Sequence, residues 1–132
     1  MNLVIDASAM VVALADSGSD GAWAERLVHE HSLAAPALFW AEATNLFRRM
    51  EAAGDLTLAE AGAVREELMQ FAVEAFPFRP FAARIWELRH NLTSYDAWYV
   101  ALAESLDCPL ATLDLRLARA PGPRCAFLTP VD

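Results

Sequence analysis

The chain contains no lysine, so all ten of its basic residues are arginines. Against them stand 18 acidic residues, which gives a formal net charge of −8. This balance excludes a general basic surface of the kind that grips nucleic acid through many phosphates. Local arginine clusters can still contact RNA or an acidic partner, because the forked guanidinium matches the oxygens of phosphates and carboxylates.

Long apolar runs are also missing, and none approaches the roughly 20 residues that a membrane span requires. The first residues lack the basic and apolar segments of a signal peptide, which predicts a cytoplasmic protein. The only two cysteines, Cys108 and Cys125, are interpreted as small buried residues in a reducing compartment. The 132 residues, 56% of them hydrophobic, predict one domain over residues 1–132 with a packed core.

Strand and helix patterns alternate along the whole chain. Short aliphatic runs predict buried parallel strands at 2–6, 33–35, 109–113 and 125–128, and a proline-containing run predicts an edge strand at 75–79. Helices are predicted from Ser8, as the N-cap, to Asp16, and over 21–31, 36–50, 57–71, 80–89 and 115–120. A further helix carries Asp96, begins after Thr93 or Ser94 as the N-cap and runs through Leu106. This order predicts a single α/β domain, with a mainly parallel central sheet of four to five short strands flanked by helices.

Four acids stand alone in strongly apolar settings: Asp6, Glu42, Asp96 and Asp114. Asp6 and Asp114 each close an expected strand, which places both at the carboxyl edge of the sheet, where α/β proteins bind ligands. A buried unpaired carboxylate is costly or becomes protonated, so four such groups call for a shared explanation. A divalent cation with hard oxygen ligands, Mg²⁺ or Mn²⁺, supplies one.

Each acid also has a purely structural explanation. Asp6 and Asp114 can cap the helices that follow them, although Ser8 is available for the first of these helices. Asp96 lies in the first turn of a helix, where the helix dipole favours a negative charge. Glu42 forms a polar stripe with Asn45 and Arg49, and the apolar surroundings favour a stripe that faces a cleft rather than solvent.

The segments around these acids resemble the PIN-domain ribonucleases, and most closely the VapC-type toxins of toxin–antitoxin pairs. The resemblance covers essentially the whole chain. It is carried by VIDASA at 4–9, WAEATNL at 40–46, YDAWYVALAE at 95–104 and LATLDLRL at 110–117. It implies a single PIN-like domain with a Mg²⁺- or Mn²⁺-dependent endoribonuclease activity that a small antitoxin holds in check.

The resemblance also implies a role for individual residues. All four acids fall on the metal-binding acidic positions of the family, and Ser8, Asn45 and Thr112 fall on positions that commonly support the site. The expected phosphate contacts are Arg48, Arg49, Arg116 and Arg119. The implied reaction hydrolyses an RNA phosphodiester to a 5′ phosphate and a 3′ hydroxyl, and it requires no histidine base.

Two other α/β enzyme classes also place acids at a strand end. A receiver domain usually carries a distant essential lysine, and a haloacid-dehalogenase phosphatase requires Asp-x-Asp, whereas Asp6 is followed by Ala7 and Ser8. The alternative that stays open is a non-catalytic interaction module, whose acidic cleft binds arginines of a partner.

A partner is expected on physical grounds as well. Four tryptophans and seven phenylalanines exceed what a small core easily hides, which predicts an exposed apolar patch. The family resemblance suggests a homodimer and a VapB-type antitoxin, whose helix lies in an apolar groove with a basic side chain near the acids. The helices near residues 10–30 and 38–72 are the expected surfaces.

Overall fold

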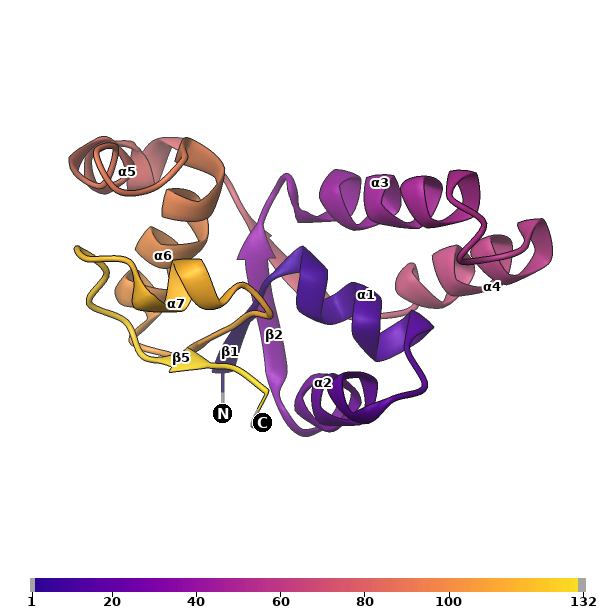
Figure 1. Ribbon diagram of the computed structural model, residues 1–132. Coiled ribbons are helices and arrows are strands. Elements are labelled where there is room, and N and C mark those ends of the chain that lie inside the picture. The colour runs from indigo at the N-terminus through magenta and orange to yellow at the C-terminus, as the bar shows by residue number, and fades with distance from the viewer. Residues whose placement is uncertain (1, 131–132) are drawn as a thin grey trace.

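The aliphatic run at the start of the chain forms the central strand of the sheet. The computed structural model describes residues 2–130 (Figure 1). In it, β1 (Asn2–Ile5) pairs in parallel with β2 (Ser32–Pro36) on one side and with β4 (Leu110–Ala111) on the other. The edge strands are β3 (Val73–Phe76) and β5 (Phe127–Leu128), so the order is β3-β2-β1-β4-β5. All four pairings are parallel, as the sequence predicted.

Helices flank this sheet. They are α1 (Ala7–Ala15), α2 (Ser19–Glu30), α3 (Phe39–Ala52), α4 (Leu58–Leu68), α5 (Ala82–Glu87), α6 (Ser94–Leu106) and α7 (Leu115–Arg119), with a 3₁₀ turn, η1 (Arg79–Phe81), before α5. Figure 1 shows α5, α6 and α7 on one side of β1 and β2, and α1 to α4 on the other. The predicted α/β class is therefore confirmed. Within residues 2–130, none of the helices combines the length and the apolar character that crossing a bilayer requires.

The core is built on β1 and α6. Leu3, Val4 and Ile5 are completely buried, which explains an aliphatic run without polar alternation. The helix α6 packs against β1, β2 and β4, and it contributes the buried residues Val100 and Leu102. Because the central strands are held on both faces, the residues at their carboxyl ends have fixed positions.

Several element boundaries differ from the prediction. The edge strand covers 73–76 rather than 75–79, because Pro77 has no N–H with which to continue the ladder. The predicted helix over 80–89 is a 3₁₀ turn followed by the short α5. The helix α2 begins at Ser19, inside the predicted loop, because the Asp16 side chain accepts hydrogen bonds from the backbone N–H groups of Gly18 and Gly21.

The two cysteines are free thiols, Cys108 buried and Cys125 partly buried. Burial raises the pKa of the Cys125 thiol to about 11, and burial also raises the pKa of Cys108. Both thiols are therefore protonated near neutral pH, in keeping with their interpretation as buried small side chains.

Candidate active site

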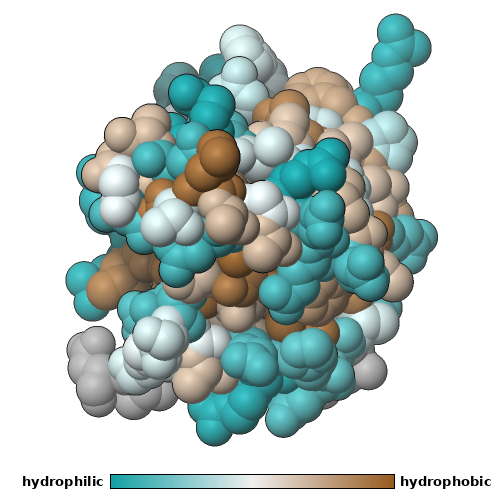
Figure 2. Space-filling view, turned by 90° about the vertical axis from the view of Figure 1, so that its right-hand side faces the viewer, coloured by the Kyte–Doolittle hydropathy of each residue, from teal (hydrophilic) through white to brown (hydrophobic). Residues whose placement is uncertain are grey.

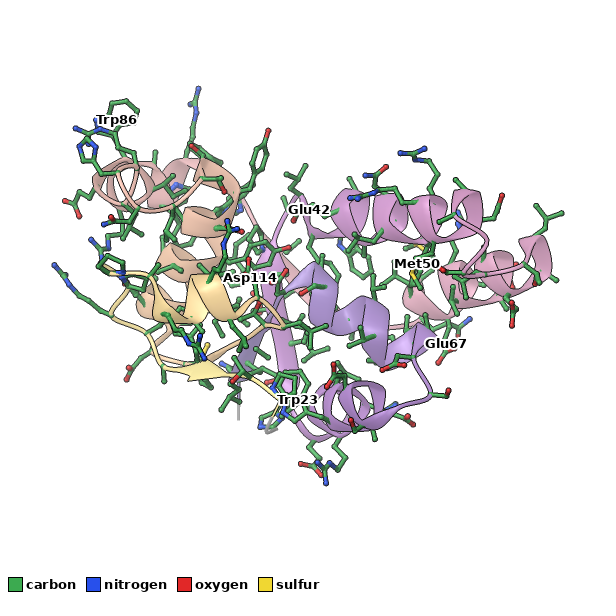
Figure 3. The ribbon with its side chains drawn as sticks, in the orientation of Figure 1. Trp23, Glu42, Met50, Glu67, Trp86 and Asp114 are labelled. Carbon is green, nitrogen blue, oxygen red and sulfur yellow. The ribbon has the colours of Figure 1, made fainter. Side chains whose placement is uncertain are left out.

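The four predicted acids meet at the carboxyl edge of the sheet. Asp6 directly follows β1, and Asp114 follows β4 and immediately precedes α7. Glu42 lies in the first turn of α3, beyond the end of β2, and Asp96 lies in the first turn of α6. Figure 3 shows Glu42 at the start of α3 and Asp114 at the start of α7, both near the middle of the molecule. Parallel strands thus bring together residues that lie far apart in the sequence.

Hydrogen bonds hold both carboxylate oxygens of Asp6. Its Oδ1 accepts from the backbone N–H of Ser8 at 3.3 Å, and Asp6 is the N-cap of α1. Its Oδ2 accepts from the hydroxyl of the fully buried Thr112 at 2.6 Å. Burial raises the pKa of Asp6, and the hydrogen bonds from Thr112 and Ser8 offset only part of this rise.

The prediction that Ser8 caps α1 is wrong. Ser8 lies inside the first turn of the helix, and its backbone N–H is bound by Asp6, the residue at which the chain leaves β1. The Ser8 Oγ is buried and has no hydrogen-bond partner within residues 2–130. The Ser8 side chain nevertheless lies close enough to Asp6 to lower the pKa of that carboxyl, so its hydroxyl belongs to the surroundings of Asp6.

A tyrosine that sequence reasoning did not include fixes Glu42. The Tyr99 hydroxyl donates a hydrogen bond to Glu42 Oε1 at 2.6 Å. Burial raises the pKa of Glu42, the Tyr99 hydrogen bond lowers it, and the charges of Asp6 and Asp96 raise it further. The signal for Tyr99 was its spacing from Asp96, three residues along α6, which places both on one face of the helix.

Asp96 is the third acid whose charge is disfavoured. Burial raises its pKa, and the charges of Asp6 and Asp114 add to the rise. A hydrogen bond from Thr93 and the charge of Arg116 oppose it but do not cancel it. The first turn of α6 therefore carries a half-buried carboxylate that interacts with two of the other acids.

Thr112 joins Asp114 to Asp6. Its hydroxyl donates to Asp6 and also accepts from the backbone N–H of Asp114 at 3.0 Å. The prediction that all four acids are buried is wrong for Asp114, which is exposed. It caps α7, because its Oδ1 accepts from the N–H groups of Arg116 at 3.0 Å and Leu117 at 3.2 Å. Asp6 and Asp114 thus cap the helices that follow them, as the structural explanation predicted, and both also lie at the edge of the sheet where the acids gather.

The donor set suits a hard divalent cation. Asp6 interacts electrostatically with Glu42, Asp96 and Asp114, and in the described part of the chain none of the four acids forms a salt bridge with a basic side chain. No group of three or more His, Cys, Asp or Glu side chains among residues 2–130 lies in an arrangement that could hold a metal ion. Capping of two helices by Asp6 and Asp114 turns some of their oxygens toward backbone N–H groups. Oxygen donors and mutual repulsion that Arg116 only partly offsets at Asp96 are nevertheless features that a Mg²⁺ or Mn²⁺ site can use.

The remaining predicted residues lie on the surface around this edge. Asn45 is exposed, and its side-chain oxygen accepts from Arg48 Nε at 2.9 Å. Arg116 lies near enough to Asp96 to lower its pKa. Arg49 on α3 and Arg119 on α7 are exposed.

Comparison with known proteins places the chain in a family. The PIN domain family matches residues 3–123. Ribonuclease VapC1 from Mycobacterium tuberculosis is 41% identical over 123 residues, which cover 92% of this chain and 92% of that protein. The crystal structure of PAE2754 from Pyrobaculum aerophilum has a TM-score of 0.70 and 26% identity, and the match covers 96% of this chain and 83% of that one. VapBC2 from Rickettsia felis, bound to a DNA fragment from their promoter, shares the fold with a TM-score of 0.69, 14% identity and 98% coverage of both chains. The chain therefore belongs to the PIN domain family and, within it, to the VapC ribonucleases.

Proposed function

We propose that this protein is a metal-dependent endoribonuclease toxin that hydrolyses RNA phosphodiesters and is inhibited by a VapB-type antitoxin. The observation that carries the proposal is the convergence of Asp6, Glu42, Asp96 and Asp114 at one edge of the sheet. The ribonuclease name of a relative that is 41% identical over nearly the whole chain supports it. The non-catalytic alternative is not favoured, because it leaves that relationship unexplained.

Oxygen chemistry favours Mg²⁺ or Mn²⁺ as the cofactor. The four carboxylates would hold the ion once their side chains move from the arrangement described above, in which no three of them are placed to bind a metal. When bound, the ion would act as a Lewis acid that lowers the pKa of a water molecule and offsets charge on the scissile phosphate. Thr112 and Tyr99 orient Asp6 and Glu42 through their hydroxyl groups.

The reaction itself is a hydrolysis. The oxygen of water adds to phosphorus as the bond to the 3′ oxygen breaks, and the water proton ends on that oxygen, so the products carry a 5′ phosphate and a 3′ hydroxyl. Burial raises the pKa of Glu42 and Asp96 in the metal-free protein, and a bound cation would offset this rise by stabilising their ionised forms. Exposed Arg116 lies beside Asp96 and supplies a positive charge for the RNA backbone.

The antitoxin is proposed to bind between α2 and α4. A groove of about 810 Å³ lies there, and Val28, Leu33 and Phe71 give it an apolar lining beside the acids Glu66 and Glu67. Figure 2 views the side of the molecule where α3 and α4 lie, and apolar residues gather in the middle of that face. An amphipathic helix with basic side chains fits such a groove. A homodimer remains a prediction.

Cleavage of cellular RNA tests this function. Purified protein is incubated with total RNA in Mg²⁺, in Mn²⁺ and in EDTA, beside Asp96→Asn and the control Asp20→Asn, which changes an acid in the first turn of α2. We expect discrete metal-dependent fragments with 5′ phosphates from the wild type and the control, and none from Asp96→Asn. Identical behaviour of all three proteins in every metal would contradict the proposal.

A further inference from the structure

Two large aromatic side chains are exposed at the same edge of the sheet as the acids. Phe78, which is 42% exposed, lies just beyond the carboxyl end of β3. Tyr95, which is 60% exposed, immediately precedes Asp96 in the first turn of α6. Trp86 is also exposed, but it lies at the outer end of α5, whereas Phe78 and Tyr95 lie at the edge that carries the acids.

A third ring supports this pair. Phe78 makes an edge-to-face contact with Trp98, with ring centroids 5.3 Å apart and planes at 83°. Trp98 lies three residues after Tyr95, so the two side chains project from the same face of α6. The Nε1 of Trp98 is buried without a hydrogen-bond partner in the described part of the chain, so packing rather than a hydrogen bond explains its position. Phe78 thus packs on Trp98, and Tyr95 shares a face of α6 with Trp98 and precedes Asp96 in the chain; these three residues are called here the aromatic rim.

The negative charge of the protein opposes RNA binding, so attraction that does not depend on charge becomes more important. A net charge of −8 and four clustered acids repel a polyanion, and few arginines are available to attract it. Stacking of bases on aromatic rings does not depend on phosphate charge, and removal of one stacking ring weakens single-strand binding by about 5- to 100-fold. A ring surface beside the acids therefore provides the binding energy that the charge of the chain does not.

We propose that Phe78 and Tyr95 position the RNA by stacking on unpaired bases next to the phosphate that is cut. This inference rests on the proposed ribonuclease function. Every base has a flat face, so stacking selects unpaired over paired nucleotides rather than one base over another. Single-stranded RNA is favoured over a protein partner as the occupant, because the rim adjoins Asp96 while the apolar groove lies elsewhere, between α2 and α4.

Binding of a fluorescein-labelled, mixed-sequence single-stranded RNA, followed by anisotropy in EDTA, tests the inference without cleavage. Tyr95→Ala and Phe78→Ala are expected to weaken binding by about 5- to 100-fold each, whereas Tyr95→Phe, which keeps the ring, retains it. Trp86→Ala is the matched control, because Trp86 is 66% exposed and Figure 3 shows it at the outer end of α5, away from Glu42 and Asp114. Its affinity for RNA is expected to equal that of the wild type.

Kinetics separate a positioning role from loss of structure. With Mg²⁺ and a single-stranded substrate, Tyr95→Ala is expected to raise KM and to leave kcat near the wild-type value. Thermal unfolding checks that each variant folds. If Phe78→Ala unfolds because it loses its contact with Trp98, the RNA affinity and KM of the surface variant Tyr95→Ala test the inference without it.

The outcomes are distinct from those of the function test. Metal-dependent cleavage by the wild type, with unchanged RNA affinity and KM in Tyr95→Ala, overturns the inference and leaves the ribonuclease in place. Weakened binding of the antitoxin together with unchanged RNA binding assigns the rim to a protein interface and also overturns the inference. Absence of cleavage by the wild type in any metal, by contrast, removes the proposed function itself.

Discussion

The hydroxyl of Tyr99 donates a hydrogen bond to Glu42 Oε1 at 2.6 Å, and this bond connects α6 to α3 across the candidate site. It opposes the rise in the pKa of Glu42 that burial causes. A group on one helix therefore helps to keep a carboxylate on another helix ionised and in place. Both effects matter if Glu42 binds a cation, because only the ionised form is a good ligand.

Tyr99→Phe tests this relationship. Loss of the hydroxyl should raise the pKa of Glu42 further, so Glu42 takes up a proton at a higher pH as the solution is acidified. We expect ribonuclease activity to fall about 10- to 100-fold, as for other residues that orient metal ligands. The acidic limb of the pH–rate profile should also move to higher pH.

The control for this variant is Tyr95→Phe, which removes the same hydroxyl from an exposed tyrosine on the same helix. Its pH–rate profile should match that of the wild type. Equal profiles for Tyr99→Phe and the wild type would show that the hydrogen bond has no part in the activity.

Thr112→Val should damage both stability and activity. The Thr112 hydroxyl donates to Asp6 and accepts from the N–H of Asp114, and the residue is fully buried. Valine has a similar shape but leaves both partners unsatisfied, so the free energy of unfolding should fall by about 1–3 kcal/mol. Urea unfolding measures this loss, and Thr112→Ser, which keeps the hydroxyl, should recover most of it. A valine variant as stable and active as the wild type would rule out the bridging role.

The placement of the acids could be predicted from the sequence because one physical rule determines it. Parallel strands end at a common edge, so Asp6 and Asp114, each directly after an aliphatic run, had to lie near each other. The choice of cap was not determined in the same way. Asp6 and Ser8 are both good N-caps, and only the point at which the chain leaves β1 selects Asp6.

Other parts of the site depend on tertiary packing. The spacing of Tyr99 from Asp96 places both on one face of α6, but its hydrogen bond to Glu42 is not evident until α3 is placed opposite it. Asn45 has the spacing of a site residue on α3, yet it binds Arg48 at the surface. The ends of β3 and β5 likewise depend on the neighbouring strand, which a single segment does not reveal.

Asp96→Asn should stabilise the metal-free protein. Burial and the charges of Asp6 and Asp114 raise the pKa of Asp96 above its ordinary value, so the folded state binds a proton more readily than the unfolded state. A carboxyl group of this kind contributes stability below its unfolded pKa, and that contribution is lost as the pH rises through the folded pKa. At pH 7 its charge therefore disfavours folding, and neutralisation should raise Tm in EDTA.

Metal ions should reverse the order of the two Tm values, so that the wild type melts at a higher temperature than Asp96→Asn. Mg²⁺ or Mn²⁺ should raise the Tm of the wild type through binding to the folded state and should raise that of Asp96→Asn much less. Asp20→Asn is the control, because this acid in the first turn of α2 interacts favourably with the helix dipole. Its Tm should fall slightly and should respond to metal as the wild type does. A lower Tm for Asp96→Asn than for the wild type in EDTA would contradict the electrostatic account.

Glu104 should show the opposite pH dependence, because its charge is well paired. Its carboxylate accepts from Arg84 Nε at 2.8 Å, from Arg84 Nη2 at 3.1 Å and from the backbone N–H of Arg124 at 2.7 Å. Burial alone would raise the pKa of Glu104, but the hydrogen bonds from Arg84 and Arg124 outweigh it and hold the pKa below the usual value. This pairing ties α6 to α5 and to the segment that leads into β5.

Glu104→Gln should therefore lower the free energy of unfolding by about 1–3 kcal/mol at pH 7. Because the folded pKa is depressed, the contribution of Glu104 is complete above its unfolded pKa of about 4.3 and is lost as the pH falls through the folded pKa. The difference in free energy of unfolding between wild type and variant, measured in urea, should thus narrow on acidification below about pH 4.

Glu87→Gln is the matched control, because Glu87 also pairs with Arg84, at 3.2 Å, but its side chain is 63% exposed. Glu87→Gln should lower the free energy of unfolding by less than about 1 kcal/mol, because surface ion pairs contribute little. If Glu104→Gln lowers the free energy of unfolding by the same amount at pH 7 and below about pH 4, packing of the side chain, and not its charge, stabilises the fold.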